Sequence, residues 1–238
     1  MCPKVSIYFS ETSLFTSRFD DFRELLSYEE NHRADQLQFE TMRQTYIISH
    51  GLLRMLLGEM TGLNPAEINI LKDGRNKPYI RNYLLHFNLS HTRNAFAIAI
   101  CPDFPVGIDL ENVNRDLDYS SIAEMCLNFR EQMYVEENMA ELCERFFLLW
   151  TRKEAYLKAV GTGITCDLRR IPSFQRFESP GSNFYEDMIN IPPHDSYFVY
   201  SQKISDYFLS IATPGRIKIQ TSIIDEAYCE KRYPVTIQ

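Results

Sequence analysis

Asp109 and Glu111 are the first residues whose types and spacing suggest chemistry. They alternate with Ile108 and Leu110 in a short segment typical of a strand, so both carboxylates should point to the same face. Two neighbouring carboxylates at the end of an apolar strand repel each other unless a cation lies between them or one is protonated. A hard divalent ion such as Mg²⁺ would remove the conflict. The alternative is a pair of acids that simply face solvent.

A second group of charged residues lies on an expected long helix that includes Arg145 and ends at Gly161. Trp150, Glu154 and Lys158 are spaced i, i+4, i+8 and therefore form one stripe along this helix. Glu154 becomes a third metal ligand if the helix packs beside the acidic strand. The alternative is an ordinary surface Glu–Lys pair, worth roughly a few tenths of a kcal/mol.

Polar and basic residues upstream could hold an anion. Ser90 and His91 close an expected strand, where hydroxyls and free backbone N–H groups suit a phosphate, although such residues also cap ordinary turns. Three basic positions of the first half would form an anion cradle if they converge, and are plain surface charges if they do not: Arg33, Arg43 and Lys77.

Composition excludes several classes of protein. The 238 residues are 45% hydrophobic and 24% charged, which are values of a globular chain. Six scattered cysteines without a C-x-x-C pair indicate reduced thiols in a cytoplasmic protein. A net charge of −7 argues against nucleic-acid or anionic-membrane partners, and no apolar stretch is long enough to span a bilayer.

The order of expected elements predicts an α+β fold of two similar halves related by a pseudo-two-fold axis. Each half would be a small antiparallel sheet packed on one long helix, and the halves would be residues 1–105 and 106–238. The first long helix is expected from Thr41 to Met60, closed by Gly62. The segment Phe96–Pro102 is echoed by Phe208–Pro214, although chance likeness of apolar strands is the alternative. The proline-containing stretch 179–195 is expected to be an exposed loop.

Three segments together resemble, in order and spacing, the signature motifs of the 4′-phosphopantetheinyl transferases: Phe87–Thr92 (FNLSHT), Val106–Glu111 (VGIDLE) and Trp150–Gly161 (WTRKEAYLKAVG). The length and doubled organisation resemble the single-chain type that activates surfactin synthetase. Gly74–Pro78 (GRNKP) resembles the G-x-x-K-P element of that type, with Asn76 where glycine is common. The resemblance covers roughly residues 30 to 165.

The resemblance implies roles for individual residues. Mg²⁺, or Mn²⁺ in its place, would be held by Asp109, Glu111 and Glu154. Coenzyme A would be bound by Ser90 and His91 at its phosphates, by Lys158 at its pyrophosphate, by Lys153 near the metal-site edge, and by Lys77, Arg33 and Arg43 at its 3′-phosphoadenosine end. The catalytic residues would be Asp109, Glu154 and Lys158.

The implied reaction is attack of a carrier-protein serine hydroxyl on the β-phosphorus of coenzyme A, with transfer of phosphopantetheine and release of 3′,5′-ADP. Glu154, or a water acting through it, would take the serine proton. The partner would be an acyl or peptidyl carrier protein, bound transiently to a monomeric enzyme, with Arg130 and Arg152 as candidate docking residues. Two alternatives remain: a Mg²⁺-dependent nuclease, and an inactive binder of coenzyme A or carrier protein.

Overall fold

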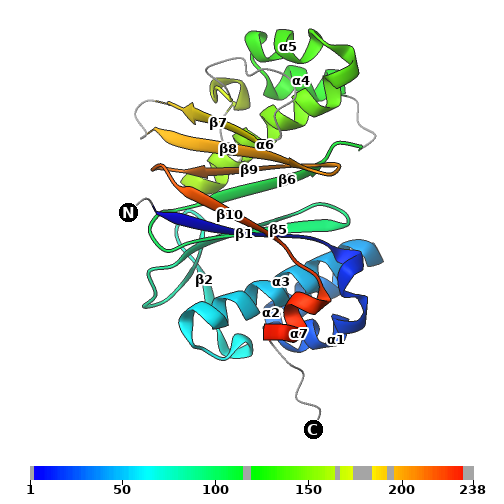
Figure 1. Cartoon of the computed structure of the whole chain (residues 1–238), viewed down its shortest axis with the longest axis vertical. Helices are drawn as coiled ribbons and strands as arrows, with labels where there is room; N and C mark the ends of the chain where they lie inside the picture. Colours follow the sequence, from blue (N-terminus) through cyan, green and yellow to red (C-terminus); the bar gives the residue numbers. More distant parts are fainter. Residues whose placement is uncertain (1–2, 115–118, 164–166, 174–183, 192–195, 233–238) are drawn as a thin grey trace.

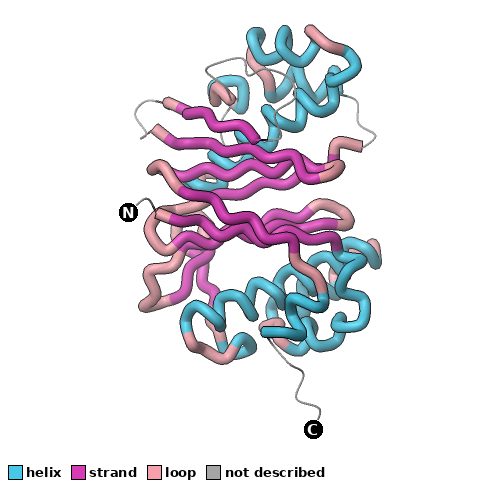
Figure 2. The backbone as a smooth tube through the Cα atoms, in the orientation of Figure 1, coloured by secondary structure: helices cyan, strands magenta, loops and turns pink. Residues whose placement is uncertain are grey.

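Two long helices cover the outer faces of two four-stranded sheets, and the sheets face each other in the middle of the molecule (Figure 1). The computed structural model describes residues 3–114, 119–163, 167–173, 184–191 and 196–232. The order of layers is therefore helix, sheet, sheet, helix, as the tube in Figure 2 shows most directly.

The helices are α1 (Phe19–Glu24), α2 (Tyr28–Asp35), α3 (Glu40–Thr61), α4 (Tyr119–Cys126), α5 (Phe129–Glu136), α6 (Leu142–Val160) and α7 (Glu226–Arg232). The strands are β1 (Lys4–Glu11), β2 (Ile70–Lys72), β3 (Pro78–Ile80), β4 (His86–His91), β5 (Ala95–Cys101), β6 (Gly107–Asn112), β7 (Phe184–Ile189), β8 (Tyr197–Ile204), β9 (Tyr207–Thr213) and β10 (Lys218–Ile223). Short 3-10 turns cover Thr12–Arg18, Pro65–Glu67, Met139–Glu141 and Leu168–Arg170.

The two halves repeat one order of elements, which is a strand, a long helix and a hairpin. In the first half β1 precedes α3 and the β4–β5 hairpin, and in the second β6 precedes α6 and the β8–β9 hairpin. The last strand of each hairpin pairs antiparallel with the first strand of its half. The echoed segments Phe96–Pro102 and Phe208–Pro214 fall on these strands, β5 and β9. The expected α+β fold of two similar halves is confirmed.

The end of the chain crosses back to the first half. β10 pairs in parallel with β1, so the first sheet has the order β10-β1-β5-β4 and is not wholly antiparallel as expected. The following residues Ile224 and Cys229 are buried in the core beneath α3. Residues 218–232 therefore lie with the first sheet, although the expected division at residue 105 assigned them to the second half.

The expected loop at 179–195 contains a strand. β7 pairs antiparallel with β8 at the edge of the second sheet, whose order is β6-β9-β8-β7. The sequence FYEDMI gives little apolar alternation because this edge strand is only partly buried. The loop prediction was wrong for residues 184–189, whereas residues 179–183 and 192–195 of the predicted loop lie outside the described residues.

Burial accounts for the apolar composition of the inner strands. β5 and β9 are buried along their whole length, because each sheet is covered on both faces.

α3 ends at Gly62 (φ 74°) and α6 at Gly161 (φ 82°), both in the left-handed conformation, as expected. Within the described ranges, none of the helices has the length and apolar character that crossing a bilayer requires.

Candidate active site

The two sheets meet at two edge strands, β4 of the first half and β6 of the second. Side chains of β4 satisfy backbone groups of β6: the N–H of Ile108 donates to Asn88 Oδ1 (2.9 Å), and the N–H of Leu110 donates to Ser90 Oγ (3.3 Å). An edge strand whose backbone groups are satisfied in this way cannot recruit another strand. The polar residues of β4 therefore connect the halves as well as facing a candidate site.

Close packing of α6 on β6 brings the helix stripe beside the acidic strand. Gly107 makes this approach possible, since a Cβ atom there would lie 2.1 Å from the carbonyl oxygen of Ala155 and 2.3 Å from the nitrogen of Ala159. No side chain fits such a gap. Gly107 of the VGIDLE segment is thus needed for the close packing of α6 on β6, a role that motif spacing alone did not suggest.

Three polar side chains converge at this junction. Lys158 Nζ lies 2.7 Å from Asp109 Oδ1 and donates to Ser90 Oγ (3.0 Å), while Ser90 Oγ donates to the same Asp109 oxygen (3.0 Å). Ser90 and Asp109 are each 5% exposed. Charge-assisted hydrogen bonds in such a partly buried place are stronger than in water. The expected meeting of α6 with the acidic strand and the Ser90 turn is present in the structure.

Two oxygens of this cluster are buried without a hydrogen-bond partner among the described residues: Asp109 Oδ2 and Glu154 Oε1. Burial raises the pKa of Glu154 to about 7, with a further rise from Asp109 and Glu111, and Lys158 opposes the shift. A pair of buried acceptors on two carboxylates, beside the further negative charge of Glu111, fits a bound cation, which would satisfy both oxygens.

The three expected metal ligands are not assembled around one point. In the described part of the chain, no three Asp, Glu, His or Cys side chains converge closely enough to hold an ion. One reason is that the Lys158 ammonium already lies against Asp109 Oδ1. Glu111 follows Asp109 by two positions on β6 and acts on Glu154 through its charge. The assignment of Asp109, Glu111 and Glu154 to a metal therefore stays a prediction.

Two basic residues that were expected at ligand surfaces are buried instead. Lys153 is fully buried, with Nζ 2.6 Å from Glu131 Oε2 and hydrogen bonds to two backbone carbonyls at 2.8 and 2.9 Å. It precedes Lys158 by five residues and so points about 140° away around the helix. Arg152 donates to Ser201 Oγ (3.0 Å) and to the Ser173 carbonyl (3.1 Å) and is 1% exposed. The expected coenzyme A contact of Lys153 and the docking role of Arg152 were wrong.

The expected cradle of Arg33, Arg43 and Lys77 does not form as one cluster. Arg43 pairs with Glu40 (2.7 Å) and donates to the Leu37 carbonyl (2.9 Å), near the start of α3. Lys77 Nζ donates to three backbone carbonyls, two at the end of α6 and one at Val106, directly before β6. Arg33, by contrast, is exposed in the last turn of α2.

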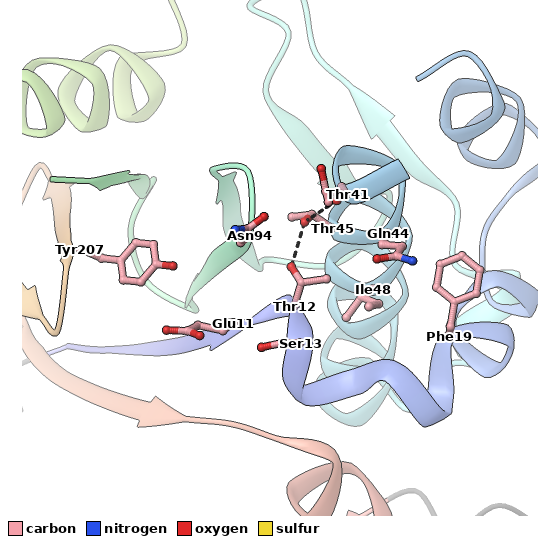
Figure 3. Close-up of a pocket in the computed structure, with 10 residues that line it drawn as sticks. All are labelled: Glu11, Thr12, Ser13, Phe19, Thr41, Gln44, Thr45, Ile48, Asn94 and Tyr207. Atoms are coloured by element: carbon pink, nitrogen blue, oxygen red, sulfur yellow. Dashed lines mark hydrogen bonds between the residues drawn. The ribbon is translucent and has the colours of Figure 1, made fainter. Parts of the chain in front are cut away.

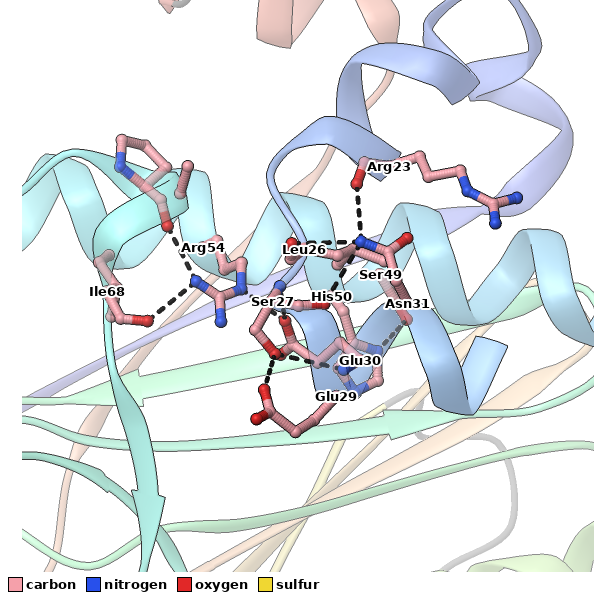
Figure 4. A network of polar contacts seen from close by, with 12 residues as sticks. Arg23, Leu26, Ser27, Glu29, Glu30, Asn31, Ser49, His50, Arg54 and Ile68 are labelled. Atoms are coloured by element: carbon pink, nitrogen blue, oxygen red, sulfur yellow. Dashed lines mark hydrogen bonds and ion pairs between the residues drawn. The ribbon is translucent and has the colours of Figure 1, made fainter. Parts of the chain in front are cut away.

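A buried network holds α2, which carries Arg33, against α3 (Figure 4). Glu30 accepts a hydrogen bond from Arg54 Nε at 2.7 Å and also closes a capping box with Ser27 at the start of α2. Arg54 is 2% exposed and donates to the carbonyls of Pro65 and Ile68. These bonds fix the orientation of α2 and hence the position of Arg33.

Two residues of α3 that sequence reasoning did not single out are affected by the charges of Arg33 and of the junction. Tyr46 and His50 stack with their ring centroids 3.8 Å apart. The charge of Arg33 acts on Tyr46, His91 acts on His50, and Lys158 in turn acts on His91. Desolvation and the Lys158 charge together lower the pKa of His91. The i, i+4 spacing of a tyrosine and a histidine was the available signal.

A separate pocket of about 360 Å³ lies at the end of β1, beside the β4–β5 hairpin and the start of α3 (Figure 3). Its lining carries one charged group, Glu11, together with hydroxyl and amide groups such as those of Thr12, Thr45 and Asn94. Thr12 and Thr45 hydrogen bond to each other (2.8 Å). No lysine, arginine or histidine lines this pocket, so its chemistry does not suit a pyrophosphate.

Two family models match the chain in succession. The model described as 4′-phosphopantetheinyl transferase, N-terminal, matches residues 15–103, and that of the 4′-phosphopantetheinyl transferase superfamily matches residues 105–212. Over 215 residues the chain is 30% identical to the 4′-phosphopantetheinyl transferase psf-1 of Bacillus pumilus, covering 90% of this chain and 88% of that protein.

Two further relatives match over shorter stretches. The chain is 34% identical to the 4′-phosphopantetheinyl transferase HetI of a Nostoc species over 153 residues, which cover 62% of this chain and 65% of HetI. It is 29% identical to a phosphopantetheinyl transferase of a Thraustochytrium species over 171 residues, which cover 66% and 59%. The chain thus spans less than two thirds of these two relatives, in contrast to psf-1.

Proposed function

The chain belongs to the 4′-phosphopantetheinyl transferase superfamily, and we infer that it is an enzyme that moves the 4′-phosphopantetheine group from coenzyme A to carrier proteins. The observation that supports this most strongly is the contact of Lys158 with Asp109 and Ser90 at the junction of the two sheets, with the unpaired Glu154 one helical turn earlier. A cytoplasmic location is part of the proposal, because coenzyme A is the co-substrate.

We propose that the acceptor is a serine hydroxyl of an acyl or peptidyl carrier protein. A bond forms between the serine oxygen and the β-phosphorus of coenzyme A, and the bond from that phosphorus to the bridging oxygen breaks. The electron pair of the broken bond leaves with 3′,5′-ADP, and the serine proton passes to a base. Such a displacement needs aligned reactants and neutralised charge rather than a covalent enzyme intermediate.

Asp109, Glu111 and Glu154 would hold Mg²⁺ in this proposal. The two buried oxygens without partners, Asp109 Oδ2 and Glu154 Oε1, support the assignment, since a cation would satisfy both. When bound, the ion would neutralise negative charge on the coenzyme A pyrophosphate. Mn²⁺ has the same preference for oxygen ligands and would be a substitute.

The protein's own side chains would divide the remaining work. The Lys158 ammonium contacts Ser90 and Asp109 at the junction of the two sheets. A pyrophosphate bound at this junction would accept a hydrogen bond from the same ammonium. Glu154, or a water molecule acting through it, would be the acceptor for the serine proton, because it is the carboxylate of this cluster on the same helix as Lys158. The 3′-phosphoadenosine end would lie toward Arg33, along Tyr46, His50 and His91.

A carrier protein needs a surface on which to dock, and α4 and α5 offer one. Met125, Phe129 and Met133 are 67%, 74% and 57% exposed on these two successive helices, and the exposed Arg130 lies among them. We propose that these exposed apolar side chains form an interaction site. We propose that an acidic carrier protein contacts this surface, which we call the α4–α5 surface.

Incubation with coenzyme A and Mg²⁺ tests the function. The full chain is mixed with the apo forms of a fatty-acid, a polyketide and a nonribosomal-peptide carrier, and each carrier is weighed intact by mass spectrometry. At least one carrier should gain one phosphopantetheine group, and a carrier with its acceptor serine replaced by alanine should gain none. If coenzyme A binds and no carrier changes mass, the chain is a binder and the proposal fails.

A further inference from the structure

Lys77 comes from the first half of the chain and reaches the end of the signature helix in the second half. Its Nζ donates to the carbonyl oxygens of Lys158 (2.9 Å), Ala159 (2.7 Å) and Val106 (3.4 Å). An ammonium group has three protons, and here each proton has an acceptor. No proton is left over for a ligand phosphate while these contacts persist.

Hydrogen bonds in the turn between β2 and β3 fix the backbone of Lys77. Asp73 Oδ1 accepts hydrogen bonds from the backbone N–H groups of Arg75 and Lys77, both at 2.9 Å, and the Asp73 N–H donates to the Lys77 carbonyl (3.0 Å). Asn76 has a φ of 63°, a conformation that asparagine tolerates better than most residues. Asparagine can therefore occupy the position at which the G-x-x-K-P element commonly has glycine.

Two of the three acceptors of Lys77, the carbonyl oxygens of Lys158 and Ala159, lie at the end of α6. The last carbonyls of α6 have no intrahelical partner and carry the negative end of the helix dipole, so a cation there is favourable. Gly161 leaves room for the Lys77 side chain, since a Cβ atom at position 161 would lie 2.8 Å from Lys77 Cγ. Burial lowers the pKa of Lys77 to about 8, so at neutral pH most molecules carry the charged form.

Lys158 is therefore held at both ends. Its carbonyl accepts from Lys77, and its ammonium contacts Ser90 and Asp109. Val106, the third acceptor of Lys77, directly precedes β6, the strand that carries Asp109. One side chain of the first half thus fixes the relative position of the helix end and the acidic strand, on which the Lys158–Asp109 distance depends.

We propose that Lys77 is a positioning residue for the transfer reaction: it sets the end of α6, and so the Lys158 ammonium, against β6, and it does not contact a phosphate of coenzyme A. The inference rests on the proposed function for its kinetic consequences, although the contact itself does not. It replaces the expectation that Lys77 binds the 3′-phosphoadenosine end. Displacing a charged group by even an ångström is enough to slow a phosphoryl transfer strongly.

The kinetic test compares Lys77→Met, which keeps the apolar stem and removes the donors, with Arg75→Met in the same turn. Arg75 is an exposed residue of equal charge. Turnover is measured with coenzyme A and with 3′-dephospho-coenzyme A. We expect kcat of Lys77→Met to fall about ten- to a hundredfold, with KM for coenzyme A and the preference over the dephospho form unchanged. Lys77→Arg, which retains charge and donors, should recover part of kcat.

An effect of Lys77→Met on KM for coenzyme A rather than on kcat contradicts the inference. If KM for coenzyme A rises in Lys77→Met and the preference for the 3′-phosphate disappears, Lys77 is a phosphate contact. Equal kcat in Lys77→Met and Arg75→Met overturns the positioning role as well.

A second measurement does not depend on activity or on the proposed function. In native-state hydrogen exchange of the full chain, Lys77→Met should speed exchange of the amides in the last turn of α6, around Lys158 to Gly161. Arg75→Met should leave them unchanged. Unaltered exchange in Lys77→Met overturns the inference even if the wild-type protein proves inactive. If Lys77→Met does not fold, Lys77→Arg and Lys77→Gln serve for the same comparison.

Discussion

Ser90 of β4 and Asp109 of β6 face each other across the junction of the two sheets, with 3.0 Å between Ser90 Oγ and Asp109 Oδ1. The same hydroxyl accepts from the Leu110 N–H and from Lys158. One small side chain therefore connects the first half, the acidic strand and the signature helix. The candidate site exists only because both halves contribute to it.

Replacing Ser90 by alanine should lower kcat by about tenfold, because Asp109 loses a donor and the buried N–H of Leu110 loses its acceptor. Steady-state transfer to a carrier measures this. Ser13→Ala is the control, since Ser13 lines the separate pocket of Figure 3 and should leave kcat and KM unaltered. A Ser90→Ala enzyme with wild-type kcat would mean that the junction does not shape the reaction.

Gly107→Ala should destabilise the fold by about 3 kcal/mol, since the added methyl group meets rigid backbone of α6. Urea unfolding followed by circular dichroism gives the free energy of unfolding. Gly74→Ala is the matched control, because a methyl group there meets nothing within 4 Å. Equal stability of the two variants would show that α6 does not pack on β6 as closely as described.

Acidification should destabilise the protein through His50. Burial lowers the pKa of this residue to about 4 in the folded state, below its ordinary value of 6.5, so between these values the unfolded chain binds a proton that the folded chain does not. Stability is thus unaffected by His50 above pH 6.5 and falls as the pH drops toward 4.

The measurement is urea unfolding at pH 7, 6 and 5 of the wild type, of His50→Gln and of His32→Gln. His50→Gln should lose less stability between pH 7 and 5 than the wild type does. His32 is exposed on α2, and its variant should follow the wild type. A His50→Gln curve parallel to that of the wild type would contradict a neutral imidazole at His50 in the folded state.

Phe129→Ser should raise KM for the carrier protein about fivefold or more and leave KM for coenzyme A unchanged, because the substitution removes an exposed apolar contact of the α4–α5 surface. Ile223→Ser, which changes an equally exposed apolar residue at the end of β10, is the control and should have no effect. Docking elsewhere is the conclusion if both variants have the wild-type KM for the carrier.

Local patterns predicted much of this molecule, and contacts between distant segments explain what they missed. The two helix ends at Gly62 and Gly161 followed from local chemistry. The parallel pairing of β10 with β1 joins residues more than two hundred positions apart, which no local period reveals.

In the candidate site, too, local patterns did not predict the contacts that single lysines make with distant segments. Helical spacing grouped Glu154 with Lys158 on one stripe of α6. The resemblance then assigned Lys153 to coenzyme A, whereas its buried partner Glu131 comes from α5, 22 residues earlier. Lys77 was likewise expected at an anion, and only the three carbonyl acceptors identify its contact.

Asp109 and Glu154 should both serve transfer at this junction, and intact-mass analysis of a carrier protein with coenzyme A and Mg²⁺ measures their contribution. Asp109→Asn and Glu154→Gln should each slow the gain of phosphopantetheine by about a hundred- to a thousandfold, while calorimetry shows a smaller loss of coenzyme A binding. Asp103→Asn and Glu230→Gln, which change exposed acids elsewhere, should modify the carrier at the wild-type rate. Normal modification by either Asp109→Asn or Glu154→Gln would contradict the account.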